Sequence, residues 1–144
     1  MNPLEFLPHR PPMRLIETVT ELVAGERASG GRRAVVTDFY FDGHFPGEAV
    51  VPAIILVEML AQVGGLAAAA PVDGAVSDPL RLRVAGLGPF KFRGAAKPGA
   101  WIEAHARVVG RLGGLYKIEG EVTSDDQVVA SGSVTLAAVP VPRS

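Results

Sequence analysis

The chain has 144 residues, of which 48% are apolar, with a formal net charge of −1 and no cysteine. This length and apolar content predict a single domain with a sizeable core. The balanced charge argues against a general nucleic-acid-binding protein, and the lack of cysteine excludes disulfides, thiolate catalysis and cysteine-ligated zinc.

Residues 1–13 are rich in proline, so no regular helix is expected there. They also lack a basic stretch followed by an apolar one, so we expect no signal peptide. With the absence of cysteine, this pattern favours a cytoplasmic protein. Two strands are then expected: one over Leu15–Ala28 that contains a turn at Ala24–Gly25, and one over Gly31–Phe41, which is rich in β-branched and aromatic residues.

One helix is predicted, over Pro52–Ala70. Proline suits the first position of a helix, and Pro71 ends it. The segment is almost long enough to span a membrane, but it carries Glu58 and Gln62 and has no flanking Lys or Arg. An apolar helix can also be the buried core of a soluble protein, which is the interpretation that we favour over a membrane span.

The rest of the chain alternates apolar and polar residues with a period of two, which is typical of antiparallel strands with one buried face. The expected strands are Pro79–Gly88, Ala100–Gly110, Leu115–Thr123 and Gln127–Val139. The apolar faces comprise Ile102, Ala104, Ala106 and Val108; Tyr116, Ile118 and Val122; and Val128, Ala130, Val134 and Leu136. One antiparallel sheet wrapped around one long central helix is an α+β architecture. The edges of such a sheet need cover, and a second copy of the chain would supply it.

His44 lies in a turn of few conformations, because Gly43 precedes it and Pro46–Gly47 follow. A histidine held so firmly suits a catalytic base. The alternative is a histidine that caps or fills the turn.

Glu58 is the other candidate, because it stands in an otherwise apolar part of the helix with Gln62 on the same face. The alternative is that this face looks out to water. Apolar surroundings raise the pKa of a carboxyl group, so Glu58 can remain protonated near neutral pH, and a protonated carboxyl is a general acid; the sequence does not give its protonation state. A base and an acid of this kind suit the removal of a proton from one carbon and a hydroxyl from the next. The backbone N–H of Ala53, at the start of the helix, is placed to bind a thioester carbonyl oxygen.

Four segments carry a resemblance to a known family: LPHR at Leu7–Arg10, GHFPG at Gly43–Gly47, LVEMLAQ at Leu56–Gln62 and KFRGAAKPG at Lys91–Gly99. Together they resemble the 3-hydroxyacyl-[acyl-carrier-protein] dehydratases of fatty-acid synthesis. The resemblance implies a hot-dog fold and a homodimer, possibly assembled as a trimer of dimers, with active sites at the subunit interface. It implies a substrate carried on the phosphopantetheine arm of acyl carrier protein, and no metal or organic cofactor.

The resemblance also implies residue roles. The catalytic roles fall on His44 and Glu58, from different subunits. The candidate substrate-binding residues are Ala53, Gly47, Phe45, Gln62 and Phe92, and the candidate carrier-docking residues are Lys91, Arg93 and Lys97. The three basic residues otherwise form an ordinary solvated strand face. Ala53 departs from the family, which usually has glycine there, and its methyl group lies close to where the thioester is expected.

Two other functions are weighed beside the dehydratase. A hot-dog acyl thioesterase would hydrolyse the thioester, and a non-catalytic subunit would only bind acyl carrier protein; the presence of both His44 and Glu58 argues against each. The pathway is either primary fatty-acid synthesis or a specialised lipid or polyketide pathway. His9 and Arg10 match the family near the substrate entrance, with a structural role as the alternative, and His105 is expected on the surface.

Overall fold

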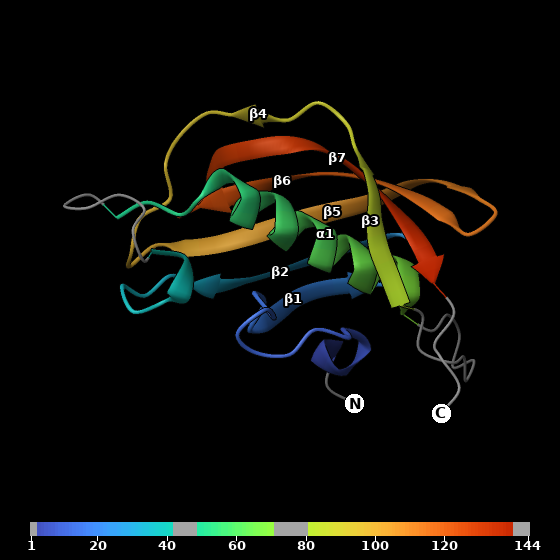
Figure 1. Ribbon diagram of the computed structural model, residues 1–144, viewed down its shortest axis with the longest axis horizontal. Coiled ribbons are helices and arrows are strands. Elements are labelled where there is room, and N and C mark those ends of the chain that lie inside the picture. The colour runs from blue at the N-terminus through green and yellow to red at the C-terminus, as the bar shows by residue number, and fades with distance from the viewer. Residues whose placement is uncertain (1–2, 42–48, 71–80, 140–144) are drawn as a thin grey trace.

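The computed structural model describes residues 3–41, 49–70 and 81–139. Seven strands form one antiparallel sheet in the described part of the chain (Figure 1). They are β1 (Thr18–Val23), β2 (Arg27–Arg33), β3 (Arg81–Leu87), β4 (Lys91–Phe92), β5 (Trp101–Leu112), β6 (Leu115–Ser124) and β7 (Gln127–Val139). Their order across the sheet is β1-β2-β5-β6-β7-β3, and the short β4 also pairs with β7. β1 is therefore one edge, and β3 together with the short β4 forms the other.

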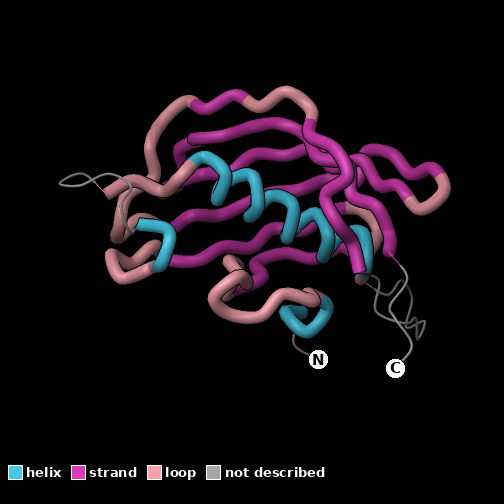
Figure 2. The backbone as a smooth tube through the Cα atoms, viewed as in Figure 1, coloured by secondary structure: helices cyan, strands magenta, loops and turns pink. Residues whose placement is uncertain are grey.

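The helix α1 (Ala53–Ala69) lies across one face of this sheet, and β3 crosses its C-terminal part in the view of Figure 1 and Figure 2. It follows Pro52, as predicted from the sequence, and its residues pack on β5, β2 and β6. Two short 3-10 helices, η1 (Pro3–Phe6) and η2 (Phe39–Phe41), complete the described secondary structure. A sheet curved around one long helix confirms the α+β, hot-dog architecture that the sequence predicts.

The buried face of the sheet follows the predicted alternation with one exception. Ile102, Ala104 and Ala106 of β5 and Ile118 and Val122 of β6 are all buried against the helix.

The exception is Val128, which is 44% exposed, while its neighbour Val129 is buried. The register between β6 and β7 shifts between Val122 and Thr123. Such a bulge turns the following side chains to the other face, so the prediction that Val128 joins the buried face was wrong.

The predicted strand over Gly31–Phe41 was also wrong, because β2 ends at Arg33 and η2 occupies Phe39–Phe41. Asp38 explains the break. Its carboxylate accepts hydrogen bonds from the Val35 backbone N–H (2.9 Å) and from Arg32 (2.6 Å). A short acidic side chain that bonds to nearby backbone competes with a strand ladder and closes a turn instead. The predicted turn at Ala24–Gly25 is present between β1 and β2.

The helix is buried where it meets the sheet, and its exposed residues are Ala53 and Ile54 in the first turn. Leu60, Val63 and Leu66 are fully buried, whereas Ile54 is 73% exposed. The wrapped sheet predicted from the sequence thus leaves the rest of the helix buried or partly buried within a single chain. Among the described residues, no helix is long and apolar enough to cross a membrane.

Two adjacent glycines of α1 have different surroundings. A Cβ built on Gly64 would lie 2.7 Å from Cγ2 of Ile118, a buried residue of β6. A Cβ on Gly65 would meet nothing within 4 Å. Gly64 thus sets how closely the helix approaches the sheet.

This difference predicts opposite effects of the same substitution. Gly64→Ala should lower the free energy of unfolding by about 1–2 kcal/mol, because overpacking against Ile118 outweighs the gain in helix propensity. Gly65→Ala should raise it by about 0.8 kcal/mol through propensity alone. Urea denaturation of both variants measures the two effects. Equal stabilisation by the two substitutions would contradict the close contact.

Candidate active site

Glu58 lies in the middle of α1, at the mouth of a cavity between the helix, the N-terminal segment and β3. Its side chain is 30% exposed. The cavity has a volume of about 300 Å³. It is lined by Leu7, Pro8, His9, Glu58, Ala61, Gln62, Gly65, Ala69, Leu82, Arg83, Val84 and Leu136. A carboxylate therefore faces a mainly apolar space large enough for part of an acyl chain.

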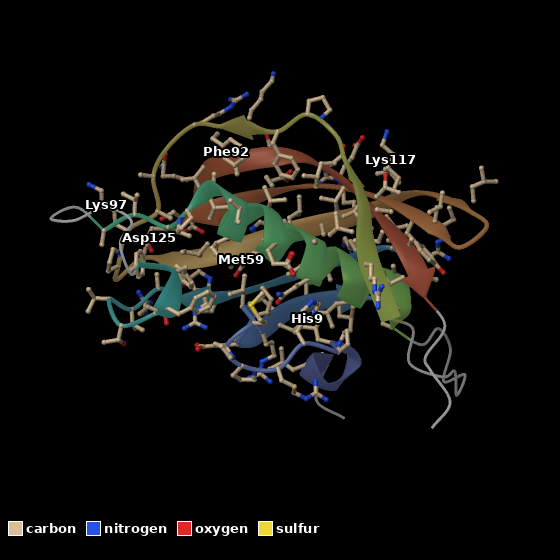
Figure 3. The ribbon with its side chains drawn as sticks, in the orientation of Figure 1. His9, Met59, Phe92, Lys97, Lys117 and Asp125 are labelled. Atoms are coloured by element: carbon tan, nitrogen blue, oxygen red, sulfur yellow. The ribbon has the colours of Figure 1, made fainter. Side chains whose placement is uncertain are left out.

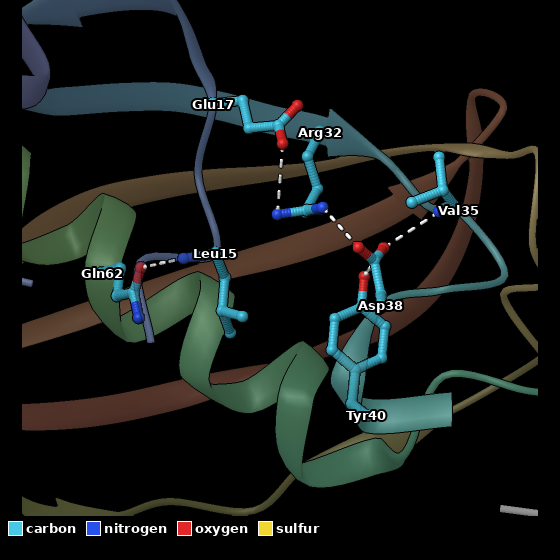
Figure 4. A network of polar contacts seen from close by, with 7 residues as sticks. All are labelled: Leu15, Glu17, Arg32, Val35, Asp38, Tyr40 and Gln62. Atoms are coloured by element: carbon cyan, nitrogen blue, oxygen red, sulfur yellow. Dashed lines mark hydrogen bonds and ion pairs between the residues drawn. The ribbon is translucent and has the colours of Figure 1, made fainter. Parts of the chain in front are cut away.

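Gln62 is buried, at 1% exposed, one helical turn after Glu58. Its Oε1 accepts a hydrogen bond from the Leu15 backbone N–H (3.0 Å; Figure 4), and its Nε2 donates to the Met13 carbonyl (2.8 Å). The same Nε2 donates to Oε1 of Glu58 (3.3 Å). The amide thus joins residues 13–15 to the helix and holds the carboxylate. Its predicted role in binding substrate stays a prediction, since these contacts all lie within the chain.

His9, on the N-terminal segment, approaches the same carboxylate, and Figure 3 shows it beside α1. Its Nε2 lies 3.5 Å from Oε1 of Glu58. Its Nδ1 is buried and has no hydrogen-bond partner among the described residues. Sequence reasoning gave His9 only a general role near the entrance. The missing information was spatial, because nothing in the spacing of residues 9 and 58 shows that they meet.

The pKa of Glu58 differs from the expectation. Burial raises this pKa, but the hydrogen bonds from His9 and Gln62 lower it more, so that the pKa falls below its ordinary value. The prediction that apolar surroundings raise the pKa of Glu58 was therefore wrong for the chain alone. Hydrogen-bond donors that stabilise the charged form decide the outcome, as they do for other carboxylates.

A lowered pKa has a consequence for stability against pH. A carboxyl whose folded-state pKa is depressed contributes stability above its unfolded pKa, near 4.3, and loses that contribution as pH falls through the folded pKa. Glu58→Gln should thus lose less stability than the wild type between about pH 5 and pH 3. Thermal unfolding of both proteins across this range measures the difference. If the wild type instead became more stable relative to Glu58→Gln as pH falls, the pKa of Glu58 would be raised in the folded state.

A second polar network holds the chain just before the GHFPG segment (Figure 4). Arg32 contacts Asp38 (2.6 Å) and Glu17 (3.3 Å), and the Tyr40 hydroxyl donates to Asp38 (2.8 Å). Burial, followed by the hydrogen bond to Asp38, raises the pKa of Tyr40. The network fixes η2, the last described element before His44, and it borders a second cavity of about 370 Å³. The sequence did not identify this network.

The structure places the other candidates as follows. Ala53 is exposed at the first position of α1, after Pro52, which offers no side-chain cap. Lys91, Phe92, Arg93 and Lys97 are exposed on and beside β4. His44, Phe45 and Gly47 lie outside the described residues.

Phe92 lies away from the Glu58 cavity. Its ring stacks on that of Phe90, with centroids 5.9 Å apart. Figure 3 shows it on the other side of α1 from His9, and it is not among the residues that line the cavity. Its role in binding substrate therefore stays a prediction without support from the cavity. His105 lies on the outer face of the sheet as expected, where its ring contacts Ser29 (2.9 Å) and Glu103 (3.4 Å).

Within the described residues, no group of three or more His, Cys, Asp or Glu side chains is arranged to hold a metal ion.

Comparison with known proteins gives consistent results. Residues 7–133 match the FabA-like domain family. The chain is 37% identical over 134 residues to the 3-hydroxyacyl-[acyl-carrier-protein] dehydratase FabZ of Nitratidesulfovibrio vulgaris, strain Miyazaki F, covering 93% of this chain and 86% of that protein. It is 32% identical over 136 residues to FabZ of Bacillus subtilis, covering 92% of each chain. Among solved structures, the dehydratase heterocomplex ApeI:P from Xenorhabdus doucetiae contains a chain with the same fold, with a TM-score of 0.77 at 15% identity over 97% of this chain and 92% of that one.

Proposed function

The chain belongs to the FabA-like family and catalyses the reaction that names its relatives, the dehydration of 3-hydroxyacyl thioesters on acyl carrier protein; we propose that Glu58 and His44 carry this chemistry. The observation that supports the assignment is the single carboxylate of α1, which faces a cavity large enough for part of an acyl chain and is the one acidic side chain among the described residues that line it. No metal or organic cofactor is needed for this reaction.

In the proposed mechanism, His44 takes the C2 proton of the substrate and Glu58 gives a proton to the C3 hydroxyl as the C3–O bond breaks. Water leaves, and the electron pair of the C2–H bond forms the double bond of a trans-2-enoyl thioester. The N–H of Ala53, with the Gly47 region, would hold the carbonyl oxygen as charge develops on it. The step is reversible, so the same groups serve hydration.

A general acid must carry a proton, whereas the pKa of Glu58 is lowered in the chain alone. Bound substrate changes this balance. The Glu58 side chain is 30% exposed, and an acyl thioester that enters the cavity displaces the water around it. Desolvation disfavours the charged form and raises the pKa, so the protonated fraction of Glu58 grows when substrate binds.

A homodimer, with each site formed by Glu58 of one chain and His44 of another, is the assembly that we propose. Apolar side chains exposed in the first turn of α1 and on the edge strand β3 support it, because a second copy that covered this edge of the sheet would remove them from water. They include Ile54 (73% exposed), Leu87 (62%) and Val84 (45%). Further assembly into a trimer of dimers and a cytoplasmic location remain predictions.

Water loss is the direct test of the function. The protein is incubated with 3-hydroxyacyl thioesters of several chain lengths on acyl carrier protein, and the products are identified by mass spectrometry. Glu58→Gln and His44→Ala should each lower kcat by about 100-fold or more, the range expected for a lost general acid or base. His105→Ala, which removes a histidine from the outer face, is the matched control.

Three outcomes separate the candidate functions. Loss of water in the wild type and the control, but not in the two variants, supports the dehydratase and the residue assignment. Release of free acid would identify a thioesterase. Binding of acyl carrier protein without either product would identify a non-catalytic subunit.

Lys91, Arg93 and Lys97 are the surface that we propose for acyl carrier protein. They are exposed on one segment, and none of the three forms an ion pair with an acidic side chain of the described residues, so their charges are available to an acidic partner. Phe92, 48% exposed between the first two, adds an apolar contact. Charges arranged in this way accelerate encounter more than they strengthen the final complex.

Charge reversal tests the docking surface. Lys91→Glu combined with Arg93→Glu should raise KM for carrier-bound substrate roughly fivefold at low salt, and less at high salt, because the interaction is screened. KM for the same acyl group on a short pantetheine thioester should not change. The control is Lys117→Glu, which reverses the charge of an exposed lysine on β6 (Figure 3). An equal rise in KM for both substrates would place these residues in the substrate site instead.

A further inference from the structure

The LPHR segment contains a histidine that the proposed mechanism does not use, and its contacts point to a definite task. Leu7 is buried at 2% exposed and anchors the segment to the core. Arg10 folds back and donates hydrogen bonds to the carbonyl oxygens of Leu7 and His9, both at 2.8 Å. Gln62 holds the chain again at residues 13–15. The backbone on both sides of His9 is thus fixed relative to α1.

Both polar contacts to the Glu58 carboxylate reach the same oxygen. His9 Nε2 lies 3.5 Å from Oε1, and Gln62 Nε2 donates to Oε1 at 3.3 Å. No contact to Oε2 is present among the described residues. The carboxylate is therefore held by one oxygen, which leaves the other for the substrate.

The environment of the imidazole indicates which nitrogen carries its hydrogen. Nδ1 is buried without a partner, so a proton there would leave a buried donor unsatisfied, which is costly. The hydrogen consequently belongs on Nε2, the nitrogen that faces Glu58. A contact of 3.5 Å is long for a hydrogen bond, but contacts in catalytic sites often shorten when substrate is bound.

We propose that His9 is a positioning residue for the dehydration: its Nε2–H donates to Oε1 of Glu58 and directs Oε2 at the C3 hydroxyl of the substrate. This inference rests on the proposed function of Glu58. The other charged group that lines the cavity is Arg83 on β3, which is exposed, and Arg10 on the N-terminal segment is engaged with carbonyl oxygens. Among the described residues, His9 is therefore the ionisable group in contact with the carboxylate.

Variants at position 9 distinguish hydrogen-bond donation to Glu58 from a role of the His9 side chain in packing alone. Glutamine places an amide N–H near the position of Nε2, whereas asparagine is too short to reach Glu58 and leucine has no donor. His9→Leu and His9→Asn should lower kcat by about 10-fold, the loss that one hydrogen bond to a charged group represents, with KM changed less than about twofold. His9→Gln should retain most of the wild-type kcat. His105→Leu is the matched control, because it removes a histidine that contacts a different glutamate at 3.4 Å.

A carboxylate titration adds a readout that a structural role would not move. With ¹³C-labelled glutamate, NMR follows the ionisation of Glu58 directly. Loss of the donor should raise the pKa of Glu58 in His9→Leu and His9→Asn but not in His9→Gln. If leucine prevents folding, the asparagine–glutamine pair still makes the comparison.

The proposal is overturned if His9→Asn keeps wild-type kcat, or if His9→Gln is as impaired as His9→Asn with an unchanged Glu58 titration. A wild type that releases no water from any substrate would instead refute the proposed function, and the titration would then decide the His9–Glu58 contact by itself.

Discussion

The hydrogen bonds of Gln62 are the constraint on which the site depends. A buried amide at mid-helix is stable only if its polar atoms are paired, and here the partners are the backbone at Met13 and Leu15 and the Glu58 carboxylate. This pairing brings an irregular, proline-rich segment against α1 and forms one wall of the cavity. A site of this kind needs residues distant in sequence, and one side chain of the helix connects them.

The packing of α1 explains why the site opens where it does. Gly64 lets the helix lie closely on Ile118 of β6, so one side of α1 packs against the sheet. The opposite side, with Ile54 exposed and Glu58 partly so, is left for other contacts. The same arrangement that builds the core therefore presents the carboxylate to the cavity and an apolar surface to a second chain.

Much of the fold was predictable from the sequence, because the period-two alternation and the single helix specify a wrapped sheet. Glu58 and Gln62 stand out in the sequence as the polar residues of an apolar helix. The misjudged features depend on local competition or on distance in space. Asp38 ends a strand whose composition favours β structure, a bulge turns Val128 outward, and donors from His9 and Gln62 reverse the pKa shift that apolar surroundings imply for Glu58.

In the proposed assembly the Glu58 cavity is half of a site, completed by His44 of a second chain. Mixing the inactive variants His44→Ala and Glu58→Gln after dissociation and reassembly is the most direct test. If the two residues come from different chains, half of the dimers are mixed and each mixed dimer has one intact site, so roughly a quarter of the wild-type dehydratase activity should return. If no activity returns while mixed dimers form, each chain contains its own complete site and the account is wrong.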